Sequence, residues 1–393
     1  MEQGQNGANL GIIGWDSYDF IVADLERSRR FYTEQMRVPE VARLDPKTSA
    51  ERGEQGVLFA AGKARVVCTS PTVKGSRADR WLRRHPDGVS VLSFRVRDLE
   101  HTRQTLARRG ATAATTVVSE EDVAGRPLSW FEIATPLGEV RFRFVERPID
   151  ALPAGFRLLE PEGAYNPYDL QVIDHVTSNF LTLEPYVSWL RDVMGFEEYW
   201  RVHFHTSDVR GGTGGSGLAS TVMWEPESGI KFANNEPAAP NYEASQIYTF
   251  VETNNGPGVQ HVAFHVPRIV PAVEGLRRSG IEFLDTPVTY YDMLPERLAR
   301  RKVTTFSEDI ELLKRLKILV DGEDDRYLLQ IFMVEGGVMY DDAKAGPFFY
   351  ELIQRRGARG FGEGNFRALF EAIEHDQEKR SLVAKQLEAG AGS

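Results

Sequence analysis

The sequence predicts an α+β protein made of two related halves, each with a strand, a helix and then several more strands. The halves align without gaps in three stretches, at offsets of 158, 170 and 208 residues: 173–194 on 15–36, 258–280 on 88–110 and 349–355 on 141–147. The third alignment has a single identity, Arg355 on Arg147, and is the weakest. We therefore expect a duplicated fold.

Hydrophobic periodicity predicts the elements of each half in order. In the first half we expect strands over 18–22, 56–60, 65–69, 89–96 and 130–145, and helices over 25–36 and 99–109. In the second half we expect strands over 173–177, 220–224, 246–252, 259–266 and 327–334, and helices over 183–193 and 270–279. Gly110 and Gly280 each end a predicted helix, because glycine favours a helix stop.

A stretch rich in proline and glycine, from Pro148 to Pro167, lacks any periodicity and separates the halves. We place the domain boundary there, with an N-terminal domain over 1–150 and a C-terminal domain over 151–393. The first domain is expected to have no metal site, and the second to be catalytic.

The C-terminus has no counterpart in the first half. Asn365 is suited to cap a helix, and apolar residues then recur at helical spacing. These residues are Phe366, Leu369, Phe370 and Ile373. We expect this C-terminal helix to cover the active site of the second half.

Composition excludes several classes of function. The net charge of -10 disfavours nucleic acid as a partner, because phosphate binding needs a basic surface. No apolar run approaches the ~20 residues that cross a bilayer. The single cysteine, Cys68, excludes an internal disulfide, and no signal peptide is recognisable, so we expect a cytoplasmic protein.

Three side chains in the second half are candidate metal ligands because the first half lacks them. His175 aligns with Ser17, His261 with Val91 and Glu351 with Arg143. Two imidazoles and one carboxylate leave coordination positions open, as in non-haem Fe(II) oxygenases. We predict that these three residues bind one Fe(II).

Other polar clusters offer rival sites. His203 and His205 share one face of a strand, but they run into a glycine-rich segment and are interpreted as an exposed strand end. His265 is too far along its strand from His261 to share an ion, and is interpreted as structural. The segment 85–87 is typical of a turn, and the glycine run 211–217 lacks the lysine of a phosphate loop.

Five segments of the second half resemble the signature segments of the 4-hydroxyphenylpyruvate dioxygenase family. They are 173–176, 258–261, 328–332, 351–355 and 360–366. The resemblance implies two tandem vicinal-oxygen-chelate domains, open barrels of βαβββ repeats, with Fe(II) in the second. The family's ligands fall on His175, His261 and Glu351.

The resemblance also implies a set of substrate contacts. Ser220, Asn235 and Gln246 match a catalytic polar cluster that orients a phenol, and uncharged amides and a hydroxyl suit this task. The other contacts implied are Gln260 and Gln330 near the metal, and Phe332, Phe361, Asn365 and Phe366 around the ring. Ala233 stands where the family commonly has proline, so the loop before Asn235 is expected to differ in shape from that of the family.

The implied reaction converts 4-hydroxyphenylpyruvate and O2 to homogentisate and CO2 in tyrosine catabolism. We expect these two small molecules, and further copies of the chain in a homo-oligomer, as the partners. One alternative is 4-hydroxymandelate synthase, which takes the same substrate; the bulk of Phe366 favours the dioxygenase. A second alternative is a non-catalytic small-molecule binding module of the same fold, which the complete triad disfavours.

Overall fold

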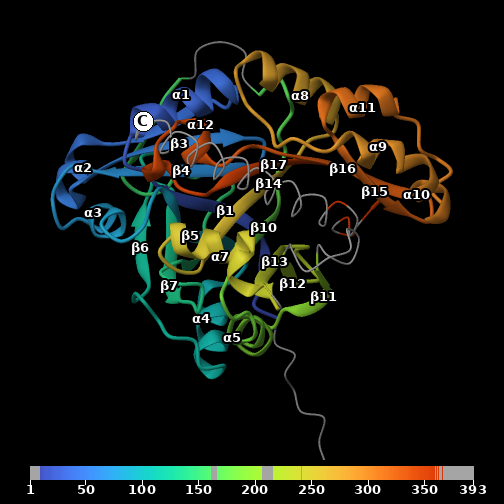
Figure 1. The fold of residues 1–393 in the computed structure, drawn as a ribbon. Helices are drawn as coiled ribbons and strands as arrows, with labels where there is room; N and C mark the ends of the chain where they lie inside the picture. Colours follow the sequence, from blue (N-terminus) through green and yellow to red (C-terminus); the bar gives the residue numbers. More distant parts are fainter. Residues whose placement is uncertain are drawn as a thin grey trace, which may run out of the picture.

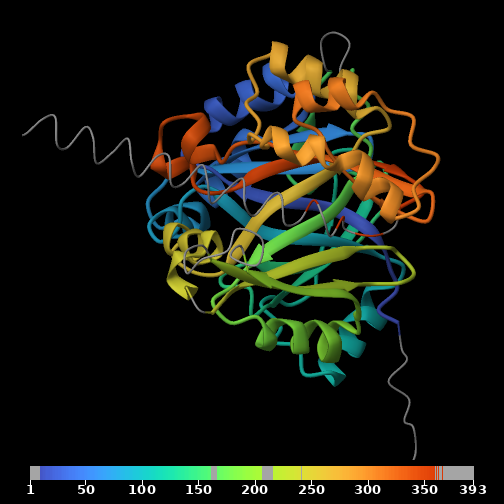
Figure 2. The ribbon, with the colours of Figure 1, turned by 45° about the vertical axis from the view of Figure 1, so that its right-hand side comes forward.

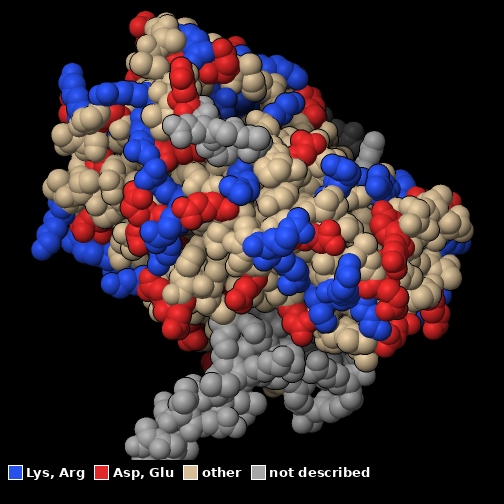
Figure 3. Space-filling model, turned by 90° about the horizontal axis from the view of Figure 1, so that it is seen from above, with Lys and Arg blue, Asp and Glu red and all other residues tan. Residues whose placement is uncertain are grey.

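The computed structural model describes residues 9–160, 166–205, 216–239, 241–358, 360, 362 and 365. It confirms the predicted α+β class: two curled mixed sheets face each other, with helices around them (Figures 1 and 2). None of the helices in these residues combines the length and apolar composition needed to span a bilayer. On the face drawn in Figure 3, basic and acidic side chains are interspersed.

The first sheet has the strand order β6-β7-β8-β5-β1-β4-β3-β2-β9. Its strands are β1 (Ile12–Ile21), β2 (Glu40–Leu44), β3 (Glu54–Ala61), β4 (Ala64–Pro71), β5 (Gly88–Val96), β6 (Val118–Glu121), β7 (Pro127–Ala134), β8 (Arg141–Glu146) and β9 (Phe156–Leu158). The helices of this half are α1 (Leu25–Arg30), continued as the π-helix η1 (Phe31–Gln35), α2 (Pro46–Arg52), α3 (Arg77–Leu82) and α4 (Leu99–Arg108). The sheet includes β9, which lies after residue 150.

The second sheet has the order β11-β12-β13-β10-β14-β17-β16-β15. Its strands are β10 (Ile173–Asn179), β11 (Glu197–His205), β12 (Gly217–Trp224), β13 (Lys231–Ala238), β14 (Gly258–His265), β15 (Leu319–Glu323), β16 (Arg326–Phe332) and β17 (Phe349–Arg356). The helices are α5 (Glu184–Trp189), η2 (Leu190–Met194), η3 (Tyr242–Ala244), α7 (Gln246–Thr253), α8 (Ile269–Arg278), α9 (Val288–Asp292), α10 (Leu294–Arg300), α11 (Ile310–Leu316), α12 (Gly336–Met339) and η4 (Ala343–Ala345).

Strand pairing reproduces all three repeat offsets. In the first half Trp15 pairs with Phe94 and Ser93 with Arg143, and in the second half Ile173 pairs with Phe264 and Ala263 with Glu351. Each of these positions differs between the halves by the offset read from the sequence. The weakest alignment, of 349–355 on 141–147, is therefore structurally correct.

Two predicted strands differ from the structure. The segment 246–252 is not a strand but helix α7, because Ser245 caps it and its buried residues, Gln246, Ile247, Phe250 and Val251, lie on one helical face. The segment 130–145 is two strands, β7 and β8, because a turn at Leu137 interrupts it. Ala233, expected in a loop, pairs with Val222 in the regular strand β13.

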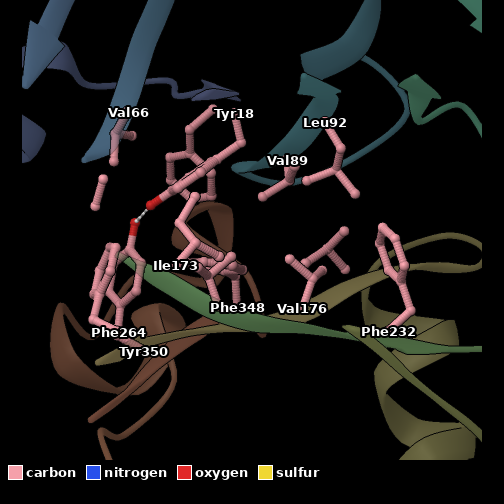
Figure 4. Packing of buried hydrophobic residues seen from close by; sticks show 14 of the residues in the cluster. Tyr18, Val66, Val89, Leu92, Ile173, Val176, Phe232, Phe264, Phe348 and Tyr350 are labelled. Atoms are coloured by element: carbon pink, nitrogen blue, oxygen red, sulfur yellow. Dashed lines mark hydrogen bonds between the residues drawn. The ribbon is translucent and has the colours of Figure 1, made fainter. Parts of the chain in front are cut away.

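The main hydrophobic core lies between the two sheets and belongs to both halves (Figure 4). Phe232 of the second half packs against Trp15 and Phe142 of the first, with ring centroids 5.5 and 5.6 Å apart. The hydroxyls of Tyr18 and Tyr350 meet across the junction at 2.7 Å. Burying these large aromatic faces removes much apolar area from water, which favours the docked halves.

The ends of equivalent helices also touch the opposite half in equivalent ways. After α8, Ser279 donates a hydrogen bond to the Gln35 carbonyl, and after α4, Arg109 donates one to the Val193 carbonyl. Residues 279 and 109, and residues 193 and 35, are related by the repeat offsets. The halves are thus related by approximate internal symmetry. The C-terminal helix expected from Asn365 lies almost wholly outside the described residues.

Candidate metal and substrate site

The three candidate ligands meet on neighbouring strands of the second sheet. His175 lies on β10, His261 on β14 and Glu351 on β17, and each is at most 2% exposed. The Nε2 atoms of the two histidines lie 3.1 and 3.3 Å from Oε2 of Glu351. Ligand atoms about 2.1 Å from one shared divalent ion lie about 3 to 3.5 Å apart. The three side chains therefore fit a single metal ion.

A β-bulge beside each histidine brings the neighbouring side chain next to its ring. Asp174 is the extra residue on β10, and its Oδ1 lies 2.9 Å from Nδ1 of His175. Gln260 is the extra residue on β14, and its Oε1 lies 3.1 Å from Nδ1 of His261. Bulges re-aim side chains in this way near functional sites. Because both Nδ1 atoms are occupied, both Nε2 atoms are left to face a metal.

Charge at the cluster also suits a cation. Burial opposes ionisation of Glu351, but His175 and His261 outweigh it and lower the pKa of the carboxyl to about 2. Burial lowers the pKa of His261. Burial opposes the charge of His175 as well, but Glu351 and Asp174 outweigh it and raise the pKa of this imidazole. Metal binding requires neutral imidazoles, so a cation would displace the proton from His175 and take over its attraction to Glu351.

Further hydrogen bonds hold the ligands in place. Gln330 Nε2 donates to Oε1 of Glu351 at 2.8 Å, which leaves Oε2 facing the histidines. The Asn365 amide lies 2.9 Å from Gln330 Oε1 and 2.6 Å from the Tyr290 hydroxyl. The predicted contacts Gln330 and Asn365 are therefore linked to the cluster through one polar chain.

A cluster of uncharged polar groups is buried on the neighbouring strands β10, β12 and β13. Ser220 pairs with Asn235 across β12 and β13, and Asn235 donates to Asn179 Oδ1 at 3.0 Å. Ser220 Oγ, Asn235 Oδ1 and Asn179 Nδ2 are buried and have no hydrogen-bond partner within the described residues. Leaving such atoms unpaired costs about 1–3 kcal/mol each, so they are suited to bind a polar ligand.

Other predicted contacts lie beside the metal ligands. Gln260 Nε2 donates to Oε1 of Gln246, on α7, at 3.2 Å. The Phe332 ring lies 6.0 Å from the ring of His261, which also stacks on Phe349 at 4.9 Å. Phe361 and Phe366, the other predicted wall residues, lie outside the described residues.

Comparison with known proteins places this site in a family. The sequence model of the Glyoxalase/Bleomycin resistance protein/Dioxygenase superfamily matches residues 14–126 and 172–293. The chain is 32% identical to 4-hydroxyphenylpyruvate dioxygenase of Dictyostelium discoideum over 93% of its own length and 99% of the relative's. It is 36% identical to that of Caenorhabditis briggsae, covering 94% and 93%. The chain belongs to the 4-hydroxyphenylpyruvate dioxygenase family.

Solved structures agree with this placement. A triple mutant of 4-hydroxymandelate synthase from Streptomyces coelicolor superposes with a TM-score of 0.77 at 26% identity, covering 93% of this chain and 99% of that one. The fold predicted from the resemblance, two tandem vicinal-oxygen-chelate domains, is confirmed.

The rival histidines lie elsewhere in the family fold. His203 is exposed, as predicted, but His205 is buried, because it packs against Gly217 of the adjacent strand. His265 contacts Gln171, and His85 contacts the Asn254 carbonyl. Among the described residues, the metal-binding group found is His175, His261 and Glu351. Most of the glycine run 211–217 lies outside the described residues.

The first half shows what replaced the ligands there. Arg143, at the position of Glu351, forms ion pairs with Asp19 at 2.9 Å and Glu132 at 2.7 Å. Burial opposes the charge of Arg143, but the two carboxylates outweigh it and raise the pKa of the guanidinium. An internal cation thus takes the place that a metal and its ligands take in the second half.

Three residues of the site, Asn179, Asp174 and Arg355, received no role in the sequence analysis. Asn179 was not singled out, although it pairs with Asn235 in register. Asp174 forms a 2.6 Å ion pair with Arg355 while it contacts His175. A signal for this pair existed: Asp174 and Arg355 are both identical to their repeat equivalents, Asp16 and Arg147, which also pair at 2.6 Å.

Proposed function

We propose that this chain is a 4-hydroxyphenylpyruvate dioxygenase, which converts 4-hydroxyphenylpyruvate and O2 to homogentisate and CO2. The observation that carries the proposal is the cluster of His175, His261 and Glu351, in the same sheet as a buried cluster of unpaired polar atoms. Two histidines and one carboxylate with open positions are typical of non-haem Fe(II) oxygenases. The proposal therefore includes Fe(II) as the metal. It also keeps the cytoplasmic location and the homo-oligomeric state expected from the sequence.

Each part of the site has a role in this reaction. The Fe(II) would supply the redox chemistry that activates O2. Ser220, Asn235 and Gln246 would hold the phenol, because an uncharged hydroxyl and amides can both donate to it and accept from it. Gln260 and Gln330 keep the ligands oriented through their bonds to His261 and Glu351. The buried position of these side chains excludes water from the reacting atoms.

The metal assignment is tested by removing one ligand at a time. His175→Ala, His261→Ala and Glu351→Ala should each lose iron and turnover, because a missing ligand weakens both affinity and geometry. Iron content measured by atomic absorption, and homogentisate measured by chromatography, report the two losses separately. His203→Ala is the control and should retain both. Full activity of Glu351→Ala, or iron retained in both histidine variants, would contradict the assignment.

A second candidate is 4-hydroxymandelate synthase, because the structural neighbour described above has that name. Product analysis decides between the two, since the synthase forms 4-hydroxymandelate. Phe366 is the residue on which the choice depends, and Phe366→Ile should shift part of the product from homogentisate to 4-hydroxymandelate. The reason is that small displacements of a reacting atom change rates by orders of magnitude. Wild-type protein that forms mainly 4-hydroxymandelate would support the synthase.

A further inference from the structure

A second cavity, of about 290 Å³, lies where the first half meets the start of β10, away from the metal ligands. Its walls come from the beginning of β1, from the turn between β3 and β4, from β5 and from the turn before β13. Four basic side chains line it: Lys63, Arg65, Arg95 and Arg147. Among the described lining residues the acidic side chain is Asp16.

The charges in this cavity do not balance. Arg147 already pairs with Asp16 at 2.6 Å, and both side chains are at most 5% exposed. Arg65 donates to the carbonyls of Ile149 and Ala151, at 2.8 and 3.3 Å, but forms no salt bridge with a carboxylate among the described residues. Three positive charges therefore remain without a carboxylate within salt-bridge distance in the part of the chain that the structure describes.

Among these side chains, Arg95 gives the strongest indication of a missing ligand. Its Nε is buried and has no hydrogen-bond partner among the described residues. A buried, unpaired donor on a charged group is costly, and native proteins pair nearly all such groups with protein, water or a ligand. Lys63 lies in the exposed turn at the same cavity. Arg95 and Lys63 therefore offer one half-buried and one exposed cation to the same cavity.

The guanidinium groups of Arg65, Arg95 and Arg147 line one cavity, so their charges repel one another. Burial lowers the pKa of Arg65 to about 10, and repulsion from Arg147 and Arg95 adds to this effect, against the attraction of Asp16. An anion placed among these groups would relieve that repulsion. This concentration of positive charge occurs in a chain whose net charge is -10, so it is not a consequence of general basicity.

The cavity is also open to a ligand. Gly14 and Gly229 both line it, and a Cβ added to either would meet no atom within 4 Å. Guanidinium groups bind carboxylates and phosphates through parallel N–H donors, whereas the ammonium of a lysine acts as a mobile point charge. The combination of Arg65, Arg95 and Lys63 provides both kinds of contact.

We propose that this cavity is a binding site for a small polyanion, a phosphate monoester or a di- or tricarboxylate, held by Lys63, Arg65 and Arg95. The site is separate from the reaction site, so it does not depend on the activity proposed above. It adjoins Val172 and Ile173, which lead into the strand that carries His175.

The test is titration calorimetry of the full-length protein with inorganic phosphate and, separately, with citrate, at constant ionic strength set by chloride. We expect saturable 1:1 binding of at least one of them, and at least tenfold weaker binding to Arg95→Gln and to Lys63→Gln. Lys63 lies in an exposed turn, so that variant should fold even if Arg95→Gln does not. Arg191→Gln removes the same charge from an exposed site on η2 and should bind like the wild type.

The two titrants separate the ligand classes: tighter phosphate binding indicates a phosphate monoester, and tighter citrate binding indicates a polycarboxylate. Heats that do not saturate with either anion would overturn the proposal. So would equal weakening in Lys63→Gln and Arg191→Gln, which would mean that only overall charge matters.

Discussion

At the scale of single residues, the duplication provides a matched control for the metal site. Asp174 and Asp16 occupy equivalent bulges, and each forms a 2.6 Å ion pair with an arginine: Arg355 near the end of β17 and Arg147 directly after β8. Asp174 differs in that it also contacts the Nδ1 atom of His175. Burial opposes ionisation of Asp174, but Arg355 and His175 hold its pKa well below the usual range. The carboxylate is therefore ionised and able to orient the imidazole.

We predict that Asp174→Asn weakens metal affinity about 10- to 100-fold, because carboxylates behind a ligand histidine fix its tautomer and orientation. Asp16→Asn should disturb an equivalent buried ion pair without changing metal affinity. Competition with a chelator, followed by metal analysis, measures both variants. Equal affinity in the two variants would show that the ion pair serves stability alone.

At the scale of elements, α7 shows how a segment can be read wrongly. Its β-branched and aromatic residues, such as Ile247 and Phe250, favour a strand in isolation. The preceding serine favours a helix instead, because it caps the N-terminus. Ser245 accepts a hydrogen bond from the Ile247 amide at 3.3 Å and donates one to the Gly217 carbonyl at 3.2 Å. This contact starts the helix and ties it to β12, which places Gln246 beside Gln260.

Ser245→Ala should therefore cost about 1 kcal/mol in the free energy of unfolding, the usual value of a helix N-cap. It should also raise the KM of the keto acid, because Gln246 follows directly. Denaturant unfolding and steady-state kinetics measure the two effects. Ser188→Ala, within α5, is the control, because the Ser188 hydroxyl bonds only exposed side chains of its own helical segment, Glu184 and Arg191, among the described residues. An unchanged stability and KM would mean that neighbouring contacts alone hold α7.

At the scale of the whole molecule, the two halves share one core. Chains with two domains often unfold in steps, but Phe232 is fully buried against rings of the first half. We predict a single unfolding transition in calorimetry. Phe232→Ala should lower the free energy of unfolding by about 3–5 kcal/mol through the cavity it leaves, and should destabilise both halves together.

Phe204→Ala is the comparison, because Phe204 belongs to a small separate cluster with Leu218 and Ile247. It should cost less than Phe232→Ala. Hydrogen exchange of amides in β5 and β14 shows whether the halves respond together. Protection lost in β14 but kept in β5 would contradict a shared core.

The sequence by itself determined the duplication, the α+β class and the three side chains that form the candidate metal site. The hydrophobic period and the identity of each residue are properties of the local sequence. Aligning the two halves therefore shows, without coordinates, which potential metal ligands occur in the second half alone. Only the tertiary structure decided that 246–252 is helical, that Asn179 joins Ser220 and Asn235, and that Lys63, Arg65 and Arg95 gather around one cavity. These features depend on strand register, on two single-residue bulges and on contacts between distant segments, and no local pattern of residues encodes such contacts.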